Sequence, residues 1–315
     1  MSTLLITGGT GFLGRHLAVK LKQDYEVILA ARNNGANILA QDLTGCQVAP
    51  LDVTNIESVR DVFNEFKPQV VIHAAATKYV NLSENNAMEC IDVNVLGSQN
   101  VARIAIDKGV NTVIGISTDK AAPPVGNIYG LSKALMERFY CSLNEKTKTK
   151  FACVRFGNIA WSSGSVFPVW KRMVEKDGKI QSTGPHMRRL FFSVDEAAEL
   201  VIRNLNNIDT LEGKVLSQKM KSAKIEDILH IWCKHYGVIW EKIHGRLGDK
   251  TDEYLIGASE LENTIEKIID GITHFVVSFN EKQQGHLTEP VSTKNAKRLS
   301  NKEILKIIST EPKLI

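Results

Sequence analysis

Five residues in the middle of the chain have the types and the spacing of a catalytic site. Thr118, Asp119 and Lys120 are consecutive, and Tyr129 and Lys133 are four residues apart. Residues four apart in a helix lie on one face, so we expect the Tyr129 and Lys133 side chains to project together. A nearby ammonium, together with a bound oxidised nicotinamide, would lower the pKa of the Tyr129 phenol. Tyr129 could then take a proton from an alcohol while a hydride leaves the alcohol carbon for the cofactor.

The neighbouring acid and amine, Asp119 and Lys120, suit a reaction beyond alcohol oxidation, which requires neither. Once C4 of a sugar has become a ketone, a base can remove the acidic hydrogen on C5. An acid can protonate the C6 hydroxyl, which leaves as water, and the hydride then returns to C6. We expect Lys120 to be the base, its pKa lowered by partial burial and neighbouring cations, and Asp119 to be the acid, its pKa raised in a closed site. The alternative is a salt bridge between them at the surface.

The segments around these residues predict an α/β fold. Short apolar runs alternate with amphipathic runs of helical spacing. This alternation implies parallel strand pairing, right-handed crossovers and a doubly wound (Rossmann) sheet. The predicted strands are 3–7, 26–32, 46–53, 68–76, 111–118 and 151–158, and the predicted helices are 12–23, 56–66, much of 85–108, and 129–143.

Three glycines mark a nucleotide site between the first strand and the first helix. Gly8, Gly11 and Gly14 form GxxGxxG, which permits a tight turn and a close approach of the backbone to a pyrophosphate. The start of the helix would face the phosphates with free N–H groups. The alternative is a purely structural turn. The residues predicted to contact the cofactor in this turn and after the fourth strand are Gly8, Thr10, Gly11, Phe12, Leu13, Gly14, Ala74, Ala75 and Ala76.

The end of the second strand indicates which dinucleotide binds. NAD sites usually have an acid there for the ribose 2′-hydroxyl, but this chain has Arg32. A guanidinium pairs well with a 2′-phosphate, so we favour NADP, with NAD as the alternative. Asp52 is placed to accept from the adenine amino group and Val53 to supply an N–H, although Asp52 could also cap a strand end. We expect His73, inside an apolar strand, to be packed rather than catalytic.

The strand–helix alternation stops after Asn158, where glycine, serine and proline cluster over residues 157–168. We expect residues 1–161 to form the dinucleotide-binding Rossmann domain. Residues 162–315 are expected to form a smaller substrate lobe that is interleaved with the first domain. The pattern of the C-terminal segment, "STKNAKRLSNKEILKIISTEPKLI", predicts a polar loop and one short helix.

The glycine fingerprint, followed by YxxxK after a strand that ends in Ser-Thr, resembles the extended short-chain dehydrogenase/reductase superfamily over about the first 160 residues. The segments "STDKA", "YGLSK", "RFGNIAWSSGSVFPVW" and "MRRLFFSVDEAAELV" are similar to the nucleotide-sugar 4,6-dehydratases that act on UDP-N-acetylglucosamine. They are most similar to the soluble, inverting subgroup, which also epimerises C5. The resemblance implies catalysis by Thr118, Asp119, Lys120 and Tyr129, and a role in polysaccharide biosynthesis.

The same resemblance, which extends to about residue 255, implies further binding residues. The segment 75–101 matches the family pattern, with Lys78 near the cofactor and the substrate and Asn94 on the supporting helix. "GRLGDKTDE" (245–253) resembles the family's Arg-Pro-Gly-Glu-Lys segment, in which Arg246 would contact the diphosphate. Arg189 is a weaker diphosphate candidate. The predicted substrate ligands, which include "SVFP" (165–168) for the uracil edge, are Lys78, Asn158, Ser165, Val166, Pro168, Arg188, Arg246, Lys250 and Glu253.

The composition predicts a cytoplasmic protein, and its slight basic bias, a net charge of +4, suits an anionic small molecule. The 39 basic and 35 acidic residues are interspersed, with no basic run for nucleic acid. The five cysteines form no CxxC, which is typical of reduced thiols, and the eight histidines lack the spacing of a metal site. No signal peptide and no apolar run long enough for a bilayer are recognisable.

Other functions remain compatible with the same fold. A nucleotide-sugar 4-epimerase or reductase would transfer hydride without losing water, and Asp119 and Lys120 argue against it. A non-catalytic, NADP-binding regulator would not need the Tyr129 and Lys133 pair. Many members of the family that this sequence resembles are dimers or larger oligomers, so we expect a homo-oligomer.

Overall fold

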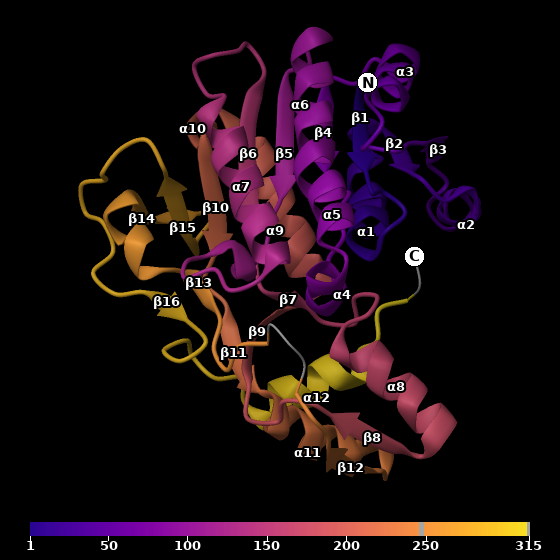
Figure 1. Ribbon diagram of the computed structural model, residues 1–315, viewed down its shortest axis with the longest axis vertical. Coiled ribbons are helices and arrows are strands. Elements are labelled where there is room, and N and C mark those ends of the chain that lie inside the picture. The colour runs from indigo at the N-terminus through magenta and orange to yellow at the C-terminus, as the bar shows by residue number, and fades with distance from the viewer. Residues whose placement is uncertain (246–248, 314–315) are drawn as a thin grey trace.

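A nine-stranded sheet forms the centre of the protein (Figure 1). The computed structural model describes residues 1–245 and 249–313. In sheet order the strands are β14 (Thr264–Ile269), β15 (Ile272–Ser278), β10 (Lys214–Gln218), β6 (Lys150–Arg155), β5 (Thr112–Ile116), β4 (Val70–His73), β1 (Ser2–Thr7), β2 (Tyr25–Ala31) and β3 (Gln47–Pro50). Neighbouring strands are parallel from β10 to β3, whereas β14 and β15 pair antiparallel at one edge. The doubly wound α/β fold predicted from the sequence is therefore confirmed.

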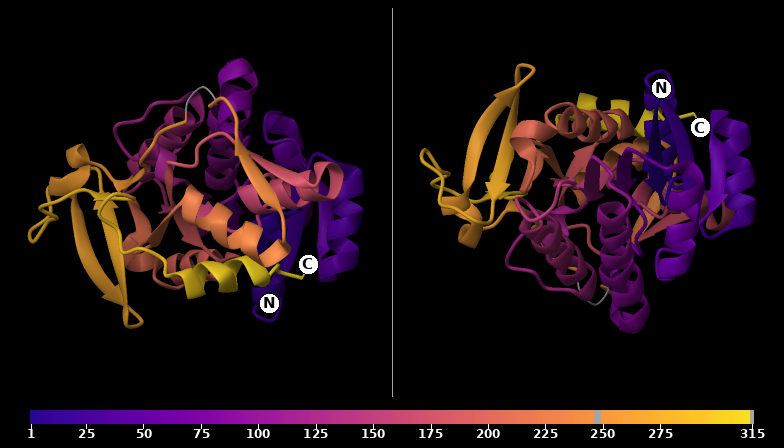
Figure 2. Two further views of the ribbon diagram at one scale, coloured as in Figure 1. Left: turned by 90° about the horizontal axis from the view of Figure 1, so that it is seen from below. Right: turned by 90° about the horizontal axis from the view of Figure 1, so that it is seen from above.

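Helices cover both faces of the sheet (Figure 2). One face carries α1 (Phe12–Leu21), α2 (Asn34–Thr44), α9 (Val194–Asn206) and α10 (Ile208–Leu211), and the other carries α3 (Ile56–Phe66), α6 (Gly97–Asp107) and α7 (Ile128–Ser142). Because the sheet is covered on both sides, Leu4, Leu5 and Ile6 of β1 are fully buried. This rigid core fixes the carboxyl ends of the strands, where ligands bind in such sheets.

The predicted helix within 85–108 is interrupted. It is built from α5 (Ala87–Ile91), the π turn η1 (Asp92–Leu96) and α6, and the short α4 (Val80–Asn85) precedes it. A π turn inserts one extra residue into a helix and is frequent at functional sites. Here the turn contains Asn94, which is buried.

A second lobe has its own core beneath the carboxyl ends of the main sheet. Its strands are β7 (Asn158–Ile159), β8 (Lys179–Ser182), β9 (Arg188–Phe192), β11 (Lys221–Lys224), β12 (Ile239–Lys242), β13 (Tyr254–Ile256) and β16 (Val291–Ser292). Its helices are α8 (Val166–Asp177), α11 (Ile225–Tyr236) and α12 (Asn301–Ser309). The described residues also include two 3-10 turns, η2 (Asp119–Ala121) and η3 (Ala258–Asn263). The rings of Phe167 and Trp232 stack in this core with centroids 5.6 Å apart.

The main sheet is larger than the six strands that the sequence indicated. The chain leaves the sheet after β6, builds part of the lobe, and returns for β10, β14 and β15. Lobe segments separate β6 from β10 and β10 from β14, and β14 and β15 form a hairpin, so these strands show no strand–helix alternation along the sequence. The division into domains at residue 161 and their interleaving stay predictions. No helix among residues 1–245 and 249–313 is both long and apolar enough to cross a membrane.

Candidate active site

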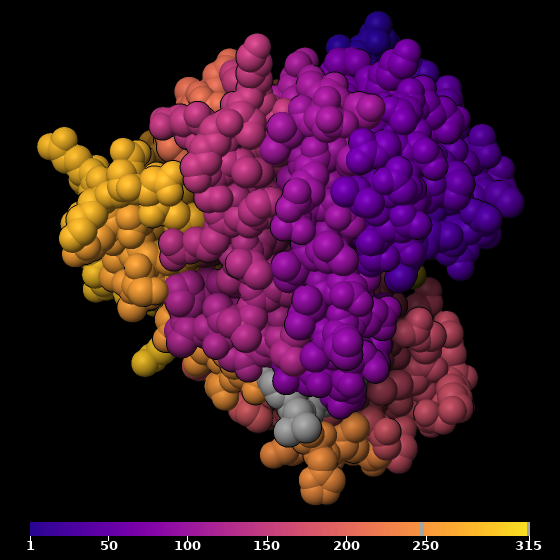
Figure 3. Space-filling view, turned by 45° about the horizontal axis from the view of Figure 1, so that its top comes forward, coloured from indigo at the N-terminus to yellow at the C-terminus, as the bar shows by residue number. Residues whose placement is uncertain are grey.

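The carboxyl ends of β1, β4 and β5 border a cavity of about 440 Å³. On the outside, the surface is hollowed between the indigo N-terminal part and the rose segment that contains α8 (Figure 3). The predicted cofactor residues that line the cavity are Gly8, Thr10, Gly11, Phe12, Leu13, Gly14, Ala74, Ala75, Ala76, Lys78, Tyr129 and Lys133. The fold thus brings the glycine turn, the end of β4 and the start of α7 to one place.

The turn after β1 has both the space and the donors for an anion. Gly8 has a φ of +67°, and a Cβ on it would lie 2.7 Å from Ala75 N, so a larger residue would clash. Gly11 precedes α1 in an extended conformation without a side-chain cap. The first N–H groups of α1 are therefore left for a ligand, and the helix dipole favours negative charge there. A dinucleotide diphosphate fits this cradle.

Arg32 and Asp52 lie in a separate depression of about 540 Å³ at the ends of β2 and β3. Arg32 is the only basic residue among the described residues that line it, and its Nη2 lies 4.0 Å from Glu89 Oε1. Asp52 Oδ1 accepts from the N–H and the hydroxyl of Thr54, at 3.0 and 2.9 Å. The other carboxylate oxygen of Asp52 is thereby left for a ligand such as an adenine amino group.

Two predicted cofactor residues lie behind the lining. Asn94 accepts from Thr77 N–H at 2.9 Å and donates to Ser132 Oγ at 2.9 Å. It therefore ties the loop after β4 to α7 rather than facing the cavity. Val53 is buried, and its carbonyl accepts from Asn100 Nδ2 at 2.9 Å.

Asp119 and Lys120 form an ion pair at the end of β5, with a buried carboxylate and a partly exposed amine. Lys120 Nζ donates to Asp119 Oδ1 at 3.0 Å, and the Thr118 hydroxyl donates to the same oxygen at 3.0 Å. Asp119 is 1% exposed, and its Oδ2 has no hydrogen-bond partner among the described residues. The salt bridge of the alternative is thus present, but with a buried carboxylate rather than on the surface. An unpartnered buried oxygen points to a role with a ligand or a proton.

The Tyr129 phenol lies near Lys120 rather than Lys133. Burial raises the pKa of Tyr129 to about 12, and Lys120 and the Thr118 hydroxyl partly oppose the rise. Lys133 Nζ donates to Ile116 O at 2.8 Å, and burial lowers the pKa of Lys133 to about 8. Lys133 is therefore turned toward β5, and the expected lowering of the Tyr129 pKa by Lys133 together with a bound nicotinamide stays a prediction.

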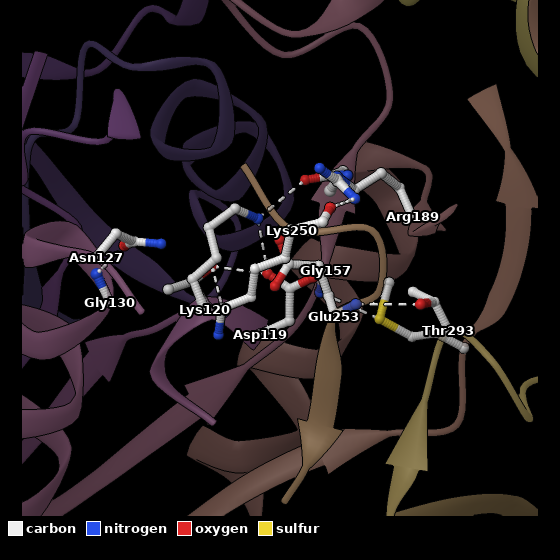
Figure 4. Close-up of polar contacts among 12 residues, drawn as sticks. Asp119, Lys120, Asn127, Gly130, Gly157, Arg189, Lys250, Glu253 and Thr293 are labelled. Carbon is white, nitrogen blue, oxygen red and sulfur yellow. Dashed lines mark hydrogen bonds and ion pairs between the residues drawn. The ribbon is translucent and has the colours of Figure 1, made fainter. Parts of the chain in front are cut away.

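The charge state of Lys120 also differs from the expectation. Burial disfavours its ammonium form, but Asp119 and Glu253 together outweigh burial and raise the pKa of Lys120. Arg189 acts in the opposite direction. The predicted lowering is wrong because two carboxylates, one of them distant in sequence, lie beside the amine (Figure 4).

A second cavity, of about 220 Å³, adjoins the first on the lobe side. Lys120, Asn158, Gly164 and Ser165 line both cavities, so Lys120 lies where the two meet. Predicted substrate ligands that line one or both are Lys78, Asn158, Ser165 and Val166. A reacting group that spans both cavities would pass the Lys120 amine.

Arg188, which with Arg246 was the stronger arginine candidate for the diphosphate, faces elsewhere. Arg188 forms a bidentate ion pair with Asp252, whereas its neighbour Arg189 lines the second cavity. Successive residues of a strand point to opposite faces, so only one of the two can face that cavity. Arg189 also donates to Lys250 O at 2.9 Å, which fixes it against the segment that precedes β13.

The remaining predicted ligands are placed as follows. Lys250 donates to Pro124 O and so joins its segment to the loop before α7. Glu253 is 4% exposed, lines neither cavity and interacts electrostatically with Lys120. Pro168, in the first turn of α8, lines neither cavity. Arg246 lies outside the described residues.

Several lining residues were not predicted from the sequence. Trp170, Met187 and Phe191 border the second cavity and Tyr79 the first. Aromatic and methionine residues usually belong to a hydrophobic core, so their presence in the sequence does not by itself indicate a binding site. Tyr79 could have been suggested by its neighbour, the predicted Lys78. In the described part of the chain, no three histidine, cysteine or acidic side chains are grouped to hold a metal ion.

Comparisons with known proteins give one family. Its sequence profile, described as polysaccharide biosynthesis protein, matches residues 4–272. An uncharacterized membrane protein of Methanocaldococcus jannaschii is 32% identical over 97% of this chain and 95% of its own length. The UDP-N-acetylglucosamine 4,6-dehydratase (inverting) of Campylobacter jejuni serotype O:2 is 31% identical over 84% of this chain and 80% of its own. The UDP-glucose 4-epimerase of Rickettsia bellii (strain OSU 85-389) is 30% identical over 97% and 95%.

A solved structure shares the whole architecture. The X-ray structure of Pen from Bacillus thuringiensis has a TM-score of 0.90 and 25% sequence identity, and the match covers 98% of this chain and 96% of that one. The lobe and the edge strands are therefore part of the shared fold.

Proposed function

The chain belongs to the polysaccharide biosynthesis protein family, and on that premise we propose that it is an NADP-dependent nucleotide-sugar 4,6-dehydratase that acts on UDP-N-acetylglucosamine and inverts C5. The observation that carries the proposal is the Asp119–Lys120 ion pair, with its buried carboxylate, where the two cavities meet. Hydride transfer alone requires no acid and amine at that point. Elimination of water requires both.

The cofactor would be held by the glycine turn, by the start of α1 and by Lys133. A bound nicotinamide supplies a hydride acceptor for C4 and later a hydride donor for C6. Tyr129 takes the proton of the C4 hydroxyl. Because Tyr129 has a pKa of about 12 in the free protein, its activation depends on the positive charge of Lys120 and of the oxidised ring.

One internal proton transfer prepares the elimination. Lys120 Nζ and Asp119 Oδ1 are 3.0 Å apart, so a proton can pass from the ammonium to the carboxylate. The pair then consists of a neutral amine and a neutral acid. The amine takes the C5 proton, the acid protonates the C6 hydroxyl as the C–O bond breaks, and water leaves. The products are again an ammonium and a carboxylate, so the proton count balances.

The choice of NADP rests on Arg32. It lies directly after β2 in the depression that also contains Asp52, where a 2′-phosphate would sit in a dinucleotide bound along α1. No acid that could hold a free 2′-hydroxyl follows β2 directly, since Asn33 and Asn34 come next. NAD is the alternative, because acids on α3 also border this depression.

The second candidate function is that of a nucleotide-sugar 4-epimerase. The similar Rickettsia bellii protein is named as one, and Tyr129 would serve it equally. Purified protein incubated with UDP-N-acetylglucosamine separates the two by mass. Loss of one water supports the dehydratase, and an unchanged mass with an altered NMR spectrum supports the epimerase. The NMR spectrum of the dehydrated product reports the configuration at C5.

The expected homo-oligomer would use the exposed apolar face over α4, α5 and α7. These helices pack together on the near side of the sheet (Figure 1). The residues of this apolar face are Leu82, Met88, Ile91, Leu131 and Leu135, all exposed. A second copy would remove this apolar area from water.

A further inference from the structure

We propose that Glu253, held beside the Asp119–Lys120 pair by the second lobe, is a positioning carboxylate that tunes Lys120 as the base. This role rests on the proposed function but differs from substrate binding. Glu253 is 4% exposed and comes from the segment just before β13, far along the chain from Lys120. Figure 4 shows it beside Asp119 and Lys120, with Arg189 nearby. Glu253 is not among the described residues that line the two cavities, so we expect it to act on Lys120 from outside them.

A chain of hydrogen bonds holds Glu253 in this place. Its N–H donates to Thr293 Oγ1 at 3.1 Å, and Thr293 N–H donates to Glu253 O at 2.9 Å. The Thr293 hydroxyl donates to Asp252 Oδ1 at 2.7 Å, and Asp252 is ion-paired with Arg188. Arg188 therefore has a structural role rather than a phosphate-binding one, because its ion pair with Asp252 helps to fix the backbone from which the Glu253 side chain projects.

The charges around Lys120 come from four elements. The groups that face it are Asp119 of η2, Tyr129 of α7, Arg189 of β9, and Glu253. Glu253 is itself faced by Lys120, Asp119, Arg189 and Lys250, and burial raises its pKa. A carboxylate beside a lysine favours the ammonium, so removing the charge of Glu253 should let Lys120 lose its proton at lower pH.

The test is Glu253→Gln, which keeps the shape and removes the charge. Lys120 reactivity with acetic anhydride is followed against pH by peptide mass spectrometry, without substrate, because only the free amine reacts. The midpoint should fall by about one pH unit, which is about tenfold faster labelling at a fixed pH below it. Glu262→Gln is the control, because Glu262 is exposed and pairs with the exposed Lys282, and its midpoint should match the wild type.

The reaction provides a second readout. When the rate of C5 deuterium uptake is measured against pH, its fall on the acid side should occur at lower pH in Glu253→Gln than in the wild type. The KM should stay within about twofold of the wild-type value. An unchanged labelling midpoint overturns the proposal, and so does a rise in KM alone, which would make Glu253 a substrate ligand. If Glu253→Gln does not fold, Thr293→Val loosens the support of Glu253, and a midpoint that stays at the wild-type value overturns the proposal. Wild-type protein that forms no dehydrated product would refute the proposed function while leaving the labelling result to be judged separately.

Discussion

Lys120 Nζ lies 3.0 Å from Asp119 Oδ1, and the second oxygen of that carboxylate is buried without a partner among the described residues. Burying an ion pair is seldom worth its desolvation for stability alone. The pair is therefore better explained by chemistry at the junction of the two cavities. Its position also lets Lys120 act on Tyr129, so one amine would serve both the oxidation and the elimination.

Lys120→Met should abolish the elimination and also slow the oxidation. We expect C5 deuterium uptake from heavy water to fall by at least about a hundredfold, the usual range for loss of a general base. C4 oxidation, read as cofactor reduction, should remain measurable but shift to higher pH, because Tyr129 loses the cation that opposes its high pKa. Tyr129→Phe should instead lose the oxidation itself. Undiminished C5 uptake in Lys120→Met would refute Lys120 as the base.

Local patterns in the sequence predicted much of this site. The glycine turn at Gly8 and the Tyr129–Lys133 spacing each depend on a few consecutive residues, and the fold brings both to the first cavity. The charge state of Lys120 could not be predicted, because Glu253 reaches it from another lobe. The sequence also could not say whether Arg188 or Arg189 faces the second cavity, since that depends on the register of β9 against its neighbours. The return of β10 to the sheet was also missed, because this strand pairs with β6 across a long stretch of intervening chain.

Arg32→Ala tests the choice of cofactor. We expect the wild type to bind NADP⁺ more tightly than NAD⁺ in isothermal titration calorimetry. The variant should lose about tenfold or more in NADP⁺ affinity, the worth of a charge-assisted contact to phosphate, and little in NAD⁺ affinity. Lys22→Ala, on the loop after α1 and away from the depression, is the control. Equal losses for both dinucleotides would argue against a 2′-phosphate at Arg32.

His73 should make the protein less stable in mild acid. It is fully buried between the hydroxyls of Thr7 and Ser98, at 2.8 and 3.0 Å, and burial lowers its pKa to about 3. The unfolded chain takes up a proton on this histidine near pH 6.5 while the native protein does not. This histidine should therefore lower the free energy of unfolding by about 1.4 kcal/mol per pH unit as pH falls from about 6.5 toward 3. Urea unfolding of His73→Gln should show a shallower loss between pH 7 and 5, and an identical slope would contradict the assignment.

Arg155 should be a main determinant of stability. It is bidentate to Glu137 of α7, with Nε–Oε1 at 2.9 Å and Nη2–Oε2 at 2.6 Å, and also pairs with Glu260 of η3 at 2.8 Å. Arg155→Leu would leave two buried carboxylates without their cation, which should cost about 3–5 kcal/mol in urea unfolding. Asp270→Asn, which breaks the exposed pair with Arg203 at 2.9 Å, should cost no more than about 1 kcal/mol. Similar losses of unfolding free energy in the two variants would mean that the buried network contributes no more to stability than an exposed ion pair.

Leu131→Glu tests the apolar face over α4, α5 and α7. Leu131 is 57% exposed on α7, so a charge there should leave the folded protomer intact but disrupt an apolar contact between copies. We expect analytical ultracentrifugation to show an oligomer for the wild type and a smaller species for the variant. Ile268→Glu, on the exposed side of the edge strand β14 and 74% exposed, is the matched control and should sediment like the wild type. A wild-type monomer, or a variant that keeps its oligomeric state, would place any interface elsewhere.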